Sequence, residues 1–164
     1  QLTGIFNRRV VFDALDEAME NANESQDREF TTIMFDIDFF KQVNDTYGHA
    51  GGDAVLISFA KLLESEITSP NIVGRIGGEE FLAILYLNQD QAAEFCKKLI
   101  IKINDNTVNF EGIDIKISSS GGVAFSSETN TSADLTNKAD ERLYEAKKSG
   151  RNRFKLIDSE LVGD

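Results

Sequence analysis

The sequence predicts an α+β fold, in which a central, mainly antiparallel sheet is flanked by helices. Segments with helical periodicity alternate along the 164 residues with short runs of β-branched and aromatic residues. Two of these runs, 72–76 and 81–85, are separated by little more than Gly77-Gly78, which is typical of a hairpin because glycine adopts positive φ angles without strain. Strands interleaved with helices around a hairpin indicate the α+β class.

The first predicted helix covers residues 8–23, and Asn7 is placed to cap its N-terminus. Its apolar stripe at three-to-four spacing consists of Val10, Phe12, Leu15 and Met19. A polar loop then leads to a strand over residues 30–35, rich in β-branched and aromatic side chains, which terminates in Asp36-Ile37-Asp38.

Two shorter helices are predicted to follow this strand. The first covers residues 39–47 and is closed by Gly48. Gly51-Gly52-Asp53 is predicted to form a second glycine turn, after which Asp53 caps a helix that reaches about Ser65.

The remainder of the chain adds helices and strands in alternation. The predicted elements are a helix over residues 90–104, a tight turn over 110–113, a strand over 113–125, a helix over 133–149 ending at Gly150, and an edge strand over 153–156. Gly121-Gly122 lies inside one of these strands, and a double glycine there marks a bulge or a close backbone approach.

Composition predicts a single domain over residues 1–158 with a C-terminal tail over 159–164. At 41% hydrophobic residues the chain can form a proper core, and no repeat or low-complexity linker interrupts it. The single cysteine, Cys96, excludes an internal disulfide and suits a reducing compartment. No signal peptide or membrane span is visible, so we expect a cytoplasmic domain, which a membrane-tethered full-length protein could equally carry.

The net charge of −11 argues against general binding to a nucleic-acid backbone. A protein of this charge that handles phosphates must use a few placed cations and metal ions. The same charge opposes close approach of two copies, so we expect the isolated domain to be a weakly active monomer.

Acidic side chains gather around two predicted turns. Strand alternation puts Asp36 and Asp38 on one face at the end of their strand, where the turn carboxylates Glu79 and Glu80 could join them. With the Ile37 carbonyl these are hard oxygen ligands, suited to Mg²⁺ or Mn²⁺ and not to zinc. The alternatives are ordinary surface charge for the turn acids and capping of the next helix for Asp38.

Further residues could complete a nucleotide site. Lys41 starts a helix whose amides face the strand end, where phosphate oxygens could bind. Asn44 and Asp53 together offer the acceptors that guanine requires. Lys147 and Arg151 stand four residues apart and can point the same way as two phosphate ligands. Taken singly, each of these residues is also explained as a solvated charge or a helix cap.

These residues together resemble the GGDEF domain family, which comprises the diguanylate cyclases. The matching stretches in chain order are residues 2–9 (LTGIFNRR), 35–49 (FDIDFFKQVNDTYGH) with Gly52-Asp53, 75–81 (RIGGEEF) and 139–152 (ADERLYEAKKSGRN). The resemblance spans nearly the whole chain, and it implies a five-stranded sheet wrapped by helices, similar to polymerase palms and class III nucleotide cyclases.

The resemblance also implies roles for single residues. Asp36 and Glu79 would bind metal with help from the Ile37 carbonyl, and Glu80 would be a second signature carboxylate near the metals. The substrate-binding residues would be Asn44 and Asp53 for guanine, Phe39, Phe40 and Lys41 around the phosphates, and Lys147 and Arg151 for the β and γ groups.

The implied reaction condenses two GTP into cyclic dimeric GMP with loss of two pyrophosphates. Each domain would hold one GTP, so catalysis would require a homodimer, brought together by an upstream sensor or regulatory domain. The alternative is a catalytically silent GGDEF module that binds nucleotide or a partner protein; the signature acids, which degenerate modules usually lose, are all present.

One departure from the family concerns product inhibition. Many members carry an Arg-x-x-Asp site shortly before the signature, where this chain reads Thr68-Ser69-Pro70-Asn71. Neither the guanidinium nor the carboxylate is present, so inhibition by product through this site is not expected.

Overall fold

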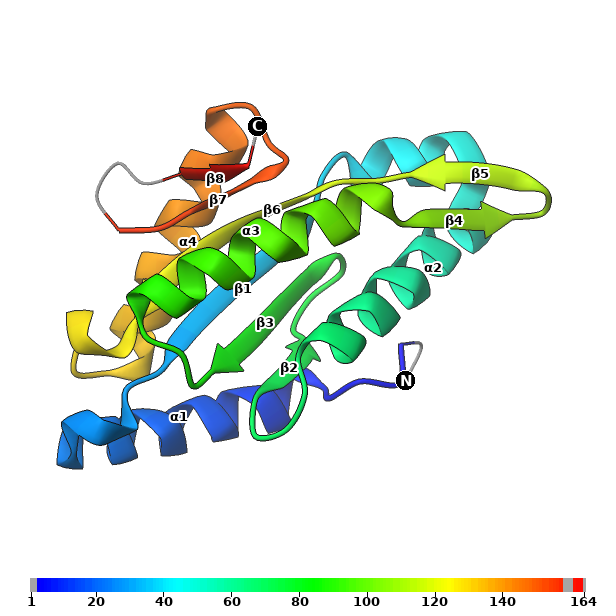
Figure 1. The fold of residues 1–164 in the computed structure, drawn as a ribbon. Coiled ribbons are helices and arrows are strands. Elements are labelled where there is room, and N and C mark those ends of the chain that lie inside the picture. Colours follow the sequence, from blue (N-terminus) through cyan, green and yellow to red (C-terminus); the bar gives the residue numbers. More distant parts are fainter. Residues whose placement is uncertain (1–2, 158–160, 164) are drawn as a thin grey trace.

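The computed structural model describes residues 3–157 and 161–163 (Figure 1). Its main sheet has six strands in the order β2-β3-β1-β6-β7-β8, and β4 and β5 form a separate hairpin. The strands are β1 (Thr31–Ile37), β2 (Ile72–Arg75), β3 (Glu80–Leu85), β4 (Thr107–Phe110), β5 (Ile113–Lys116), β6 (Ser119–Phe125), β7 (Arg153–Lys155) and β8 (Leu161–Gly163). The helices are α1 (Arg8–Glu24), α2 (Phe40–Glu66), α3 (Gln89–Asp105) and α4 (Ser132–Lys148), with 3₁₀ turns η1 (Gln26–Arg28) and η2 (Ser126–Glu128).

The α+β prediction is confirmed. All neighbouring strands of the main sheet pair antiparallel except β6 and β7, which are parallel. Strand β1 lies in the middle and pairs with β3 on one side and β6 on the other, and every one of its residues is buried. A strand buried on both faces and both edges is a rigid base for the groups at its end.

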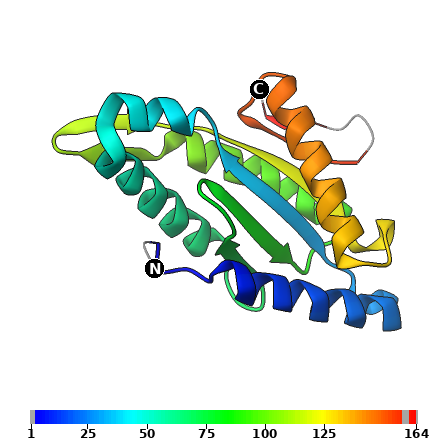
Figure 2. The ribbon, with the colours of Figure 1, turned by 180° about the vertical axis from the view of Figure 1, so that it is seen from behind.

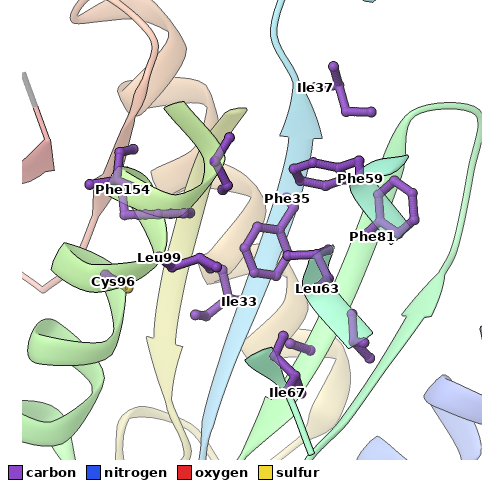
Figure 3. Packing of buried hydrophobic residues seen from close by; sticks show 14 of the residues in the cluster. Ile33, Phe35, Ile37, Phe59, Leu63, Ile67, Phe81, Cys96, Leu99 and Phe154 are labelled. Carbon is purple, nitrogen blue, oxygen red and sulfur yellow. The ribbon is translucent and has the colours of Figure 1, made fainter. Parts of the chain in front are cut away.

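Helices cover both faces of the sheet. On one face, α2 and α3 pack over alternate residues of β1, β3 and β6. Figure 3 shows Phe35 of β1 at the centre of this layer, and its ring meets those of Phe59 and Phe154 edge to face at 6.3 and 5.7 Å. On the other face, α1 and α4 cover the intervening residues, as the view from behind shows (Figure 2). In the described part of the chain no helix is both long and apolar enough to span a membrane.

Helix α4 packs closely against β6, and the double glycine in this strand explains how. A Cβ on Gly122 would lie 1.9 Å from the carbonyl oxygen of Ala139, so only glycine allows the helix backbone to come so near. The prediction of a close backbone approach is confirmed. No bulge occurs, since Gly121 and Gly122 pair in regular register with Phe35 and Met34.

The sheet differs from the predicted one in the number and order of its strands. It has six strands rather than five, and β7 is not an edge strand because β8 pairs beside it. Strand β8 is formed by Leu161–Gly163, within the segment set apart as a tail; the rest of that segment lies outside the described residues. The predicted strand over 113–125 is two strands. Residues up to Lys116 pair with β4 as β5, and residues from Ser119 pair with β1 as β6.

Two helices also differ in detail. Asn7 caps α1 as predicted, with the Val10 amide donating to Asn7 Oδ1 at 3.0 Å. The buried stripe is shifted from the predicted one, because Val11 and Ala18 are buried beside Leu15 and Met19 while Val10 is 42% exposed. The predicted turn at Gly51-Gly52-Asp53 is wrong: these residues are helical, and the bend in α2 lies at Gly48, with φ 74°.

A partly buried ion pair connects α4 to the end of β6. Two guanidinium nitrogens of Arg142 donate to the carboxylate of Glu128 at 2.6 and 2.7 Å, and Arg142 also donates to the Val123 carbonyl. The Glu128 carboxylate further accepts the Phe125 amide at 2.9 Å. Burial opposes ionisation of Glu128, but these hydrogen bonds and the Arg142 charge outweigh it and lower the pKa below 4.5.

We predict that Glu128→Gln lowers the free energy of unfolding by about 2 kcal/mol, because it leaves the partly buried Arg142 charge without its carboxylate partner. Because the folded pKa of Glu128 lies below its unfolded value, this contribution is present above that value and is lost as the pH falls through the folded pKa. Urea unfolding at pH 7 and at pH 3 measures both effects. The exposed Glu141→Gln on the same helix is the control, and equal stability of the two variants at pH 7 would contradict the prediction.

Candidate active site

The Gly-Gly signature forms the loop between β2 and β3. The hairpin is confirmed: β2 ends at Arg75, β3 begins at Glu80, and the Ile76 amide donates to the Glu80 carbonyl at 2.9 Å. Glu79 and Glu80 are both half-buried. The hairpin therefore places two adjacent carboxylates at the start of β3, beside the end of β1.

Every carbonyl of this loop accepts a hydrogen bond. Arg8 donates to Ile76 O at 2.9 Å. The Arg75 guanidinium donates to Gly77 O at 3.1 Å and to Gly78 O at 2.8 Å. The last carbonyl, that of Glu79, accepts the Ile37 amide at 3.3 Å, which connects the loop directly to the end of β1. A loop whose carbonyls are all paired holds its side chains in a defined direction.

The signature glycines do not have the role predicted for them in the turn. Neither is among the residues of the described chain that adopt a positive φ angle. A Cβ on Gly77 would lie 2.8 Å from Glu80 Oε1, whereas no atom lies within 4 Å of a Cβ on Gly78. Gly77 thus makes room for the Glu80 carboxylate, and Gly78 leaves the outer surface of the loop open.

Asp36 lies in β1 with its side chain towards α4. It is 6% exposed, and Lys147 Nζ of α4 donates to its Oδ2 at 2.5 Å. Burial raises the pKa of Asp36 and the nearby Asp38 charge adds to this, so that the Lys147 charge offsets only part of the shift. The end of β1 is therefore a place where negative charge is costly without a cation.

Glu80 faces Asp36 directly across the β1–β3 pairing. Burial raises the pKa of Glu80, and the negative charges of Asp36, Asp140 and Glu79 raise it further. Burial also raises the pKa of Asp140 on α4. The carboxylates of three elements thus repel one another across a small space.

This donor set fits a hard divalent cation. The available ligands are carboxylate oxygens and backbone carbonyls, which Mg²⁺ and Mn²⁺ prefer, and their mutual repulsion favours a cation among them. Within residues 3–157 and 161–163, no three acidic, histidine or cysteine side chains already converge as a ready metal site. In this structure Lys147 provides the compensating charge at Asp36.

Asn44 and Asp53 lie on opposite sides of the bend in α2. A Cβ on Gly52 would lie 1.9 Å from Asn44 Oδ1, so the two helical segments touch at this point only because residue 52 is glycine. Gly52 thereby allows the helical segment that carries Asp53 to approach Asn44. Asp53 is exposed, so its carboxylate is accessible to a ligand.

The predicted phosphate-binding residues fall into two groups. Lys147 and Arg151 both lie at the end of α4, and the Arg151 guanidinium stacks over the Phe39 ring at 4.5 Å from its centroid. Phe40 is half-buried against the core. The Lys41 side chain is 90% exposed and pairs with Asp45 on its own helix, so it lies apart from the Asp36–Lys147 pair.

A comparison with known protein families identifies the chain. The family model for the diguanylate cyclase GGDEF domain matches residues 1–153. This chain belongs to the GGDEF family. Among its relatives, the diguanylate cyclase DgcS of Shewanella oneidensis is 36% identical over 160 residues, which are 98% of this chain and 53% of DgcS.

Solved structures agree with this assignment. Diguanylate cyclase SiaD of Pseudomonas aeruginosa, solved in complex with its activator SiaC, has a TM-score of 0.89 and 34% identity over 95% of this chain and 60% of that chain. The GGDEF domain of DgcB from Caulobacter crescentus, solved in complex with c-di-GMP, has a TM-score of 0.90 and 29% identity over 97% of this chain and 92% of that one. The chain spans about half the length of the curated relatives it matches.

Sequence reasoning missed three contributors to the site of this GGDEF domain. Arg75 was part of the family motif, but no pattern shows that it binds two loop carbonyls. Asp140 adds its charge to the cluster from a helix distant in sequence. Asp38 is not a helix cap: the N-cap position of α2 is Phe39, and the Asp38 carboxylate accepts hydrogen bonds from elsewhere.

We predict that Arg75→Ala loosens the signature loop without unfolding the GGDEF domain. Because two loop carbonyls lose their donor, the Ile76 and Gly77 amides should exchange with solvent about tenfold faster. Amide hydrogen exchange measured by NMR gives this result residue by residue, with Arg9→Ala on the exposed side of α1 as the control. Unchanged exchange at both amides would show that Arg75 does not hold the loop.

Proposed function

We propose that this GGDEF domain is a diguanylate cyclase that condenses two GTP into cyclic dimeric GMP. One observation supports the proposal: the signature loop and the end of α4 both contact the end of β1, where Asp36 lies. The Ile37 amide binds the Glu79 carbonyl at 3.3 Å, and Lys147 reaches Asp36 at 2.5 Å. Two contacts between residues 42 and 111 positions apart thus bring the signature loop and the end of α4 to the end of β1.

Divalent metal binding is assigned to the acidic cluster. Asp36, the Ile37 carbonyl and Glu79 would hold the ion, with Glu80 as the adjoining carboxylate, and Mg²⁺ or Mn²⁺ fits these oxygens. When bound, such an ion lowers the pKa of a ribose 3′-hydroxyl and neutralises charge on the leaving pyrophosphate. The ion would also neutralise the Asp36 carboxylate in place of Lys147, so that the Lys147 ammonium could bind phosphate.

The remaining residues bind and orient GTP in this proposal. Lys147 and Arg151 bind the β and γ phosphates, and Asn44 and Asp53 hold the guanine. Phe39, Phe40 and Lys41 would surround the phosphates at the start of α2, and the exposed Lys41 side chain would have to leave Asp45 to do so. Because the site of one domain binds one GTP, two copies must face each other for the 3′-hydroxyl of one nucleotide to reach the α-phosphate of the other.

The chemical balance is simple. Two bonds form between a 3′-oxygen and an α-phosphorus, two bonds break between an α-phosphorus and the bridging oxygen, and two pyrophosphates and two protons leave. Dimerisation is the natural control point, since mass action sets the fraction of the chain that is dimeric and only the dimer can turn over. An upstream sensor or regulatory domain would supply it, as would an activator of the kind that binds SiaD.

We predict that the chain, fused to a dimerising coiled coil and incubated with GTP and Mg²⁺, releases cyclic dimeric GMP and pyrophosphate. Glu79→Ala should lower the rate at least about a hundredfold by removing a metal ligand, while thermal unfolding stays unchanged. Chromatography of the nucleotides measures turnover, and Glu141→Gln is the control. A folded, forced dimer that makes no product would favour the silent module, and full activity of Glu79→Ala would contradict the assignment of the metal site.

We further predict that added cyclic dimeric GMP depresses the initial rate little. The residues at 68–71 lack the arginine and the aspartate of the family's inhibition site, and Asn71 Oδ1 there accepts the Tyr86 amide at 2.8 Å. Initial rates at fixed GTP and rising product measure the effect. Potent non-competitive inhibition would show that product binds this domain at another place.

A further inference from the structure

The Asp38 carboxylate is buried and ordered although nothing in the proposed reaction uses it. It is 4% exposed. It accepts hydrogen bonds from Ser118 Oγ and Ser120 Oγ, both at 2.6 Å, and from the Asn152 amide at 2.9 Å. These donors come from the start of β6 and from the loop after α4, so Asp38 joins three separate segments at one point.

Backbone strain is concentrated around this carboxylate. Among the described residues, four that are not glycine adopt a left-handed φ angle. Three of them are Phe39, Arg151 and Asn152, with φ of 57°, 63° and 52°. Phe39 follows Asp38 directly, and Asn152 donates its amide to it. Such backbone conformations are unfavourable for residues other than glycine and persist only where surrounding contacts hold them.

The contacts that hold the loop can be enumerated. The Arg151 amide donates to the Ala146 carbonyl at 3.0 Å, which closes the end of α4. The Arg151 carbonyl accepts Arg153 Nε at 2.9 Å. The Asp38 carboxylate accepts a hydrogen bond from the next backbone amide, that of Asn152, and so connects this loop to the sheet end where Asp36 lies. The Arg151 guanidinium also stacks over the ring of Phe39, the residue that follows Asp38.

We propose that Asp38 is a positioning residue that holds Arg151 in line with the phosphate site. The inference rests on the proposed function, in which Arg151 binds the phosphates of GTP. Asp38 acts through the backbone: it fixes the Asn152 amide and, as the residue before Phe39, the start of α2. Arg151 is thereby confined between two anchored segments before nucleotide arrives, and its binding of phosphate costs less side-chain entropy.

A carboxylate suits this task better than an amide. It is an acceptor on both oxygens, and all three of its partners are donors. In Asp38→Asn one of the two atoms becomes a donor, so a partner is lost or must rotate. The hydrogen bonds that remain also lose the strength that charge gives them.

The test separates phosphate binding from folding and from turnover. Affinities of the 164-residue chain are measured by calorimetry for α,β-methylene GTP, which cannot release pyrophosphate, and for GMP, which lacks the β and γ groups. Arg151→Ala should weaken binding of the triphosphate about tenfold, because it removes the guanidinium that binds phosphate. Asp38→Asn should weaken it nearly as much, because it removes the charged acceptor that positions this guanidinium. Binding of GMP should change less than about twofold in either variant.

A double-mutant cycle shows whether Asp38 acts through Arg151. The variant with both changes should bind the triphosphate as Arg151→Ala does, because Asp38 has nothing left to position. Glu128→Gln is the matched control: it too loses a carboxylate, here a partly buried one, that accepts a hydrogen bond from a backbone amide, but it lies away from the site. It should lower stability and leave the ratio of the two affinities unchanged.

Each outcome decides the inference. The inference is overturned if folded Asp38→Asn keeps the wild-type ratio of triphosphate affinity to GMP affinity. It is also overturned if the losses of triphosphate affinity in the two single variants add fully in the double variant. An unchanged ratio in Arg151→Ala overturns it together with the phosphate role of Arg151. If all ratios follow expectation but a forced dimer makes no product, the proposed reaction fails and the positioning role stands.

A milder variant covers the case in which Asp38→Asn does not fold. Ser120→Ala removes one of the three donors and leaves the carboxylate bound to Asn152. It should weaken triphosphate binding about threefold, in line with the loss of one hydrogen bond, and leave GMP binding unchanged. An unchanged ratio in this variant overturns the inference as well.

Discussion

The structure depends on how negative charge is compensated at the end of β1. This strand is buried on both faces and both edges, yet it ends in two buried carboxylates, Asp36 and Asp38. An unpaired charge in such a place would cost several kcal/mol. Each carboxylate is matched in its own way: Asp36 by the Lys147 ammonium, and Asp38 by two hydroxyls and a backbone amide.

These two forms of compensation have different consequences. Asp36 is paired by a single flexible side chain on a half-exposed lysine, an arrangement that can be exchanged when other cations enter. Asp38 accepts hydrogen bonds from groups at the start of β6 and in the loop after α4. These donors can move only if β6 or that loop moves with them. Asp36 is therefore paired through one exchangeable contact, whereas Asp38 is fixed by three hydrogen bonds from two other segments.

The signature loop follows the same logic on the neighbouring strand. Its carbonyls are all bound, by Arg8, Arg75 and the Ile37 amide, so its two glutamates approach β1 in a fixed direction. The signature glycines leave space that a side chain would fill and are not required by the turn geometry, since neither adopts a left-handed φ angle. The carboxylates that repel one another here are thus held together by the backbone; burial raises the pKa of Glu80, and this repulsion raises it further.

The sequence by itself determined the class of fold, the hairpin, the cap at Asn7 and the identity of the acids, because periodicity, capping and motif spacing are local properties. It misjudged Gly51-Gly52 and Asp38, since their local patterns suit a turn and a helix cap. Only the tertiary structure decided these roles: Gly52 allows contact with Asn44 across a bend, and Asp38 binds donors about 80 and 114 residues away. Strand pairing and helix packing create those neighbours, and no local rule contains them.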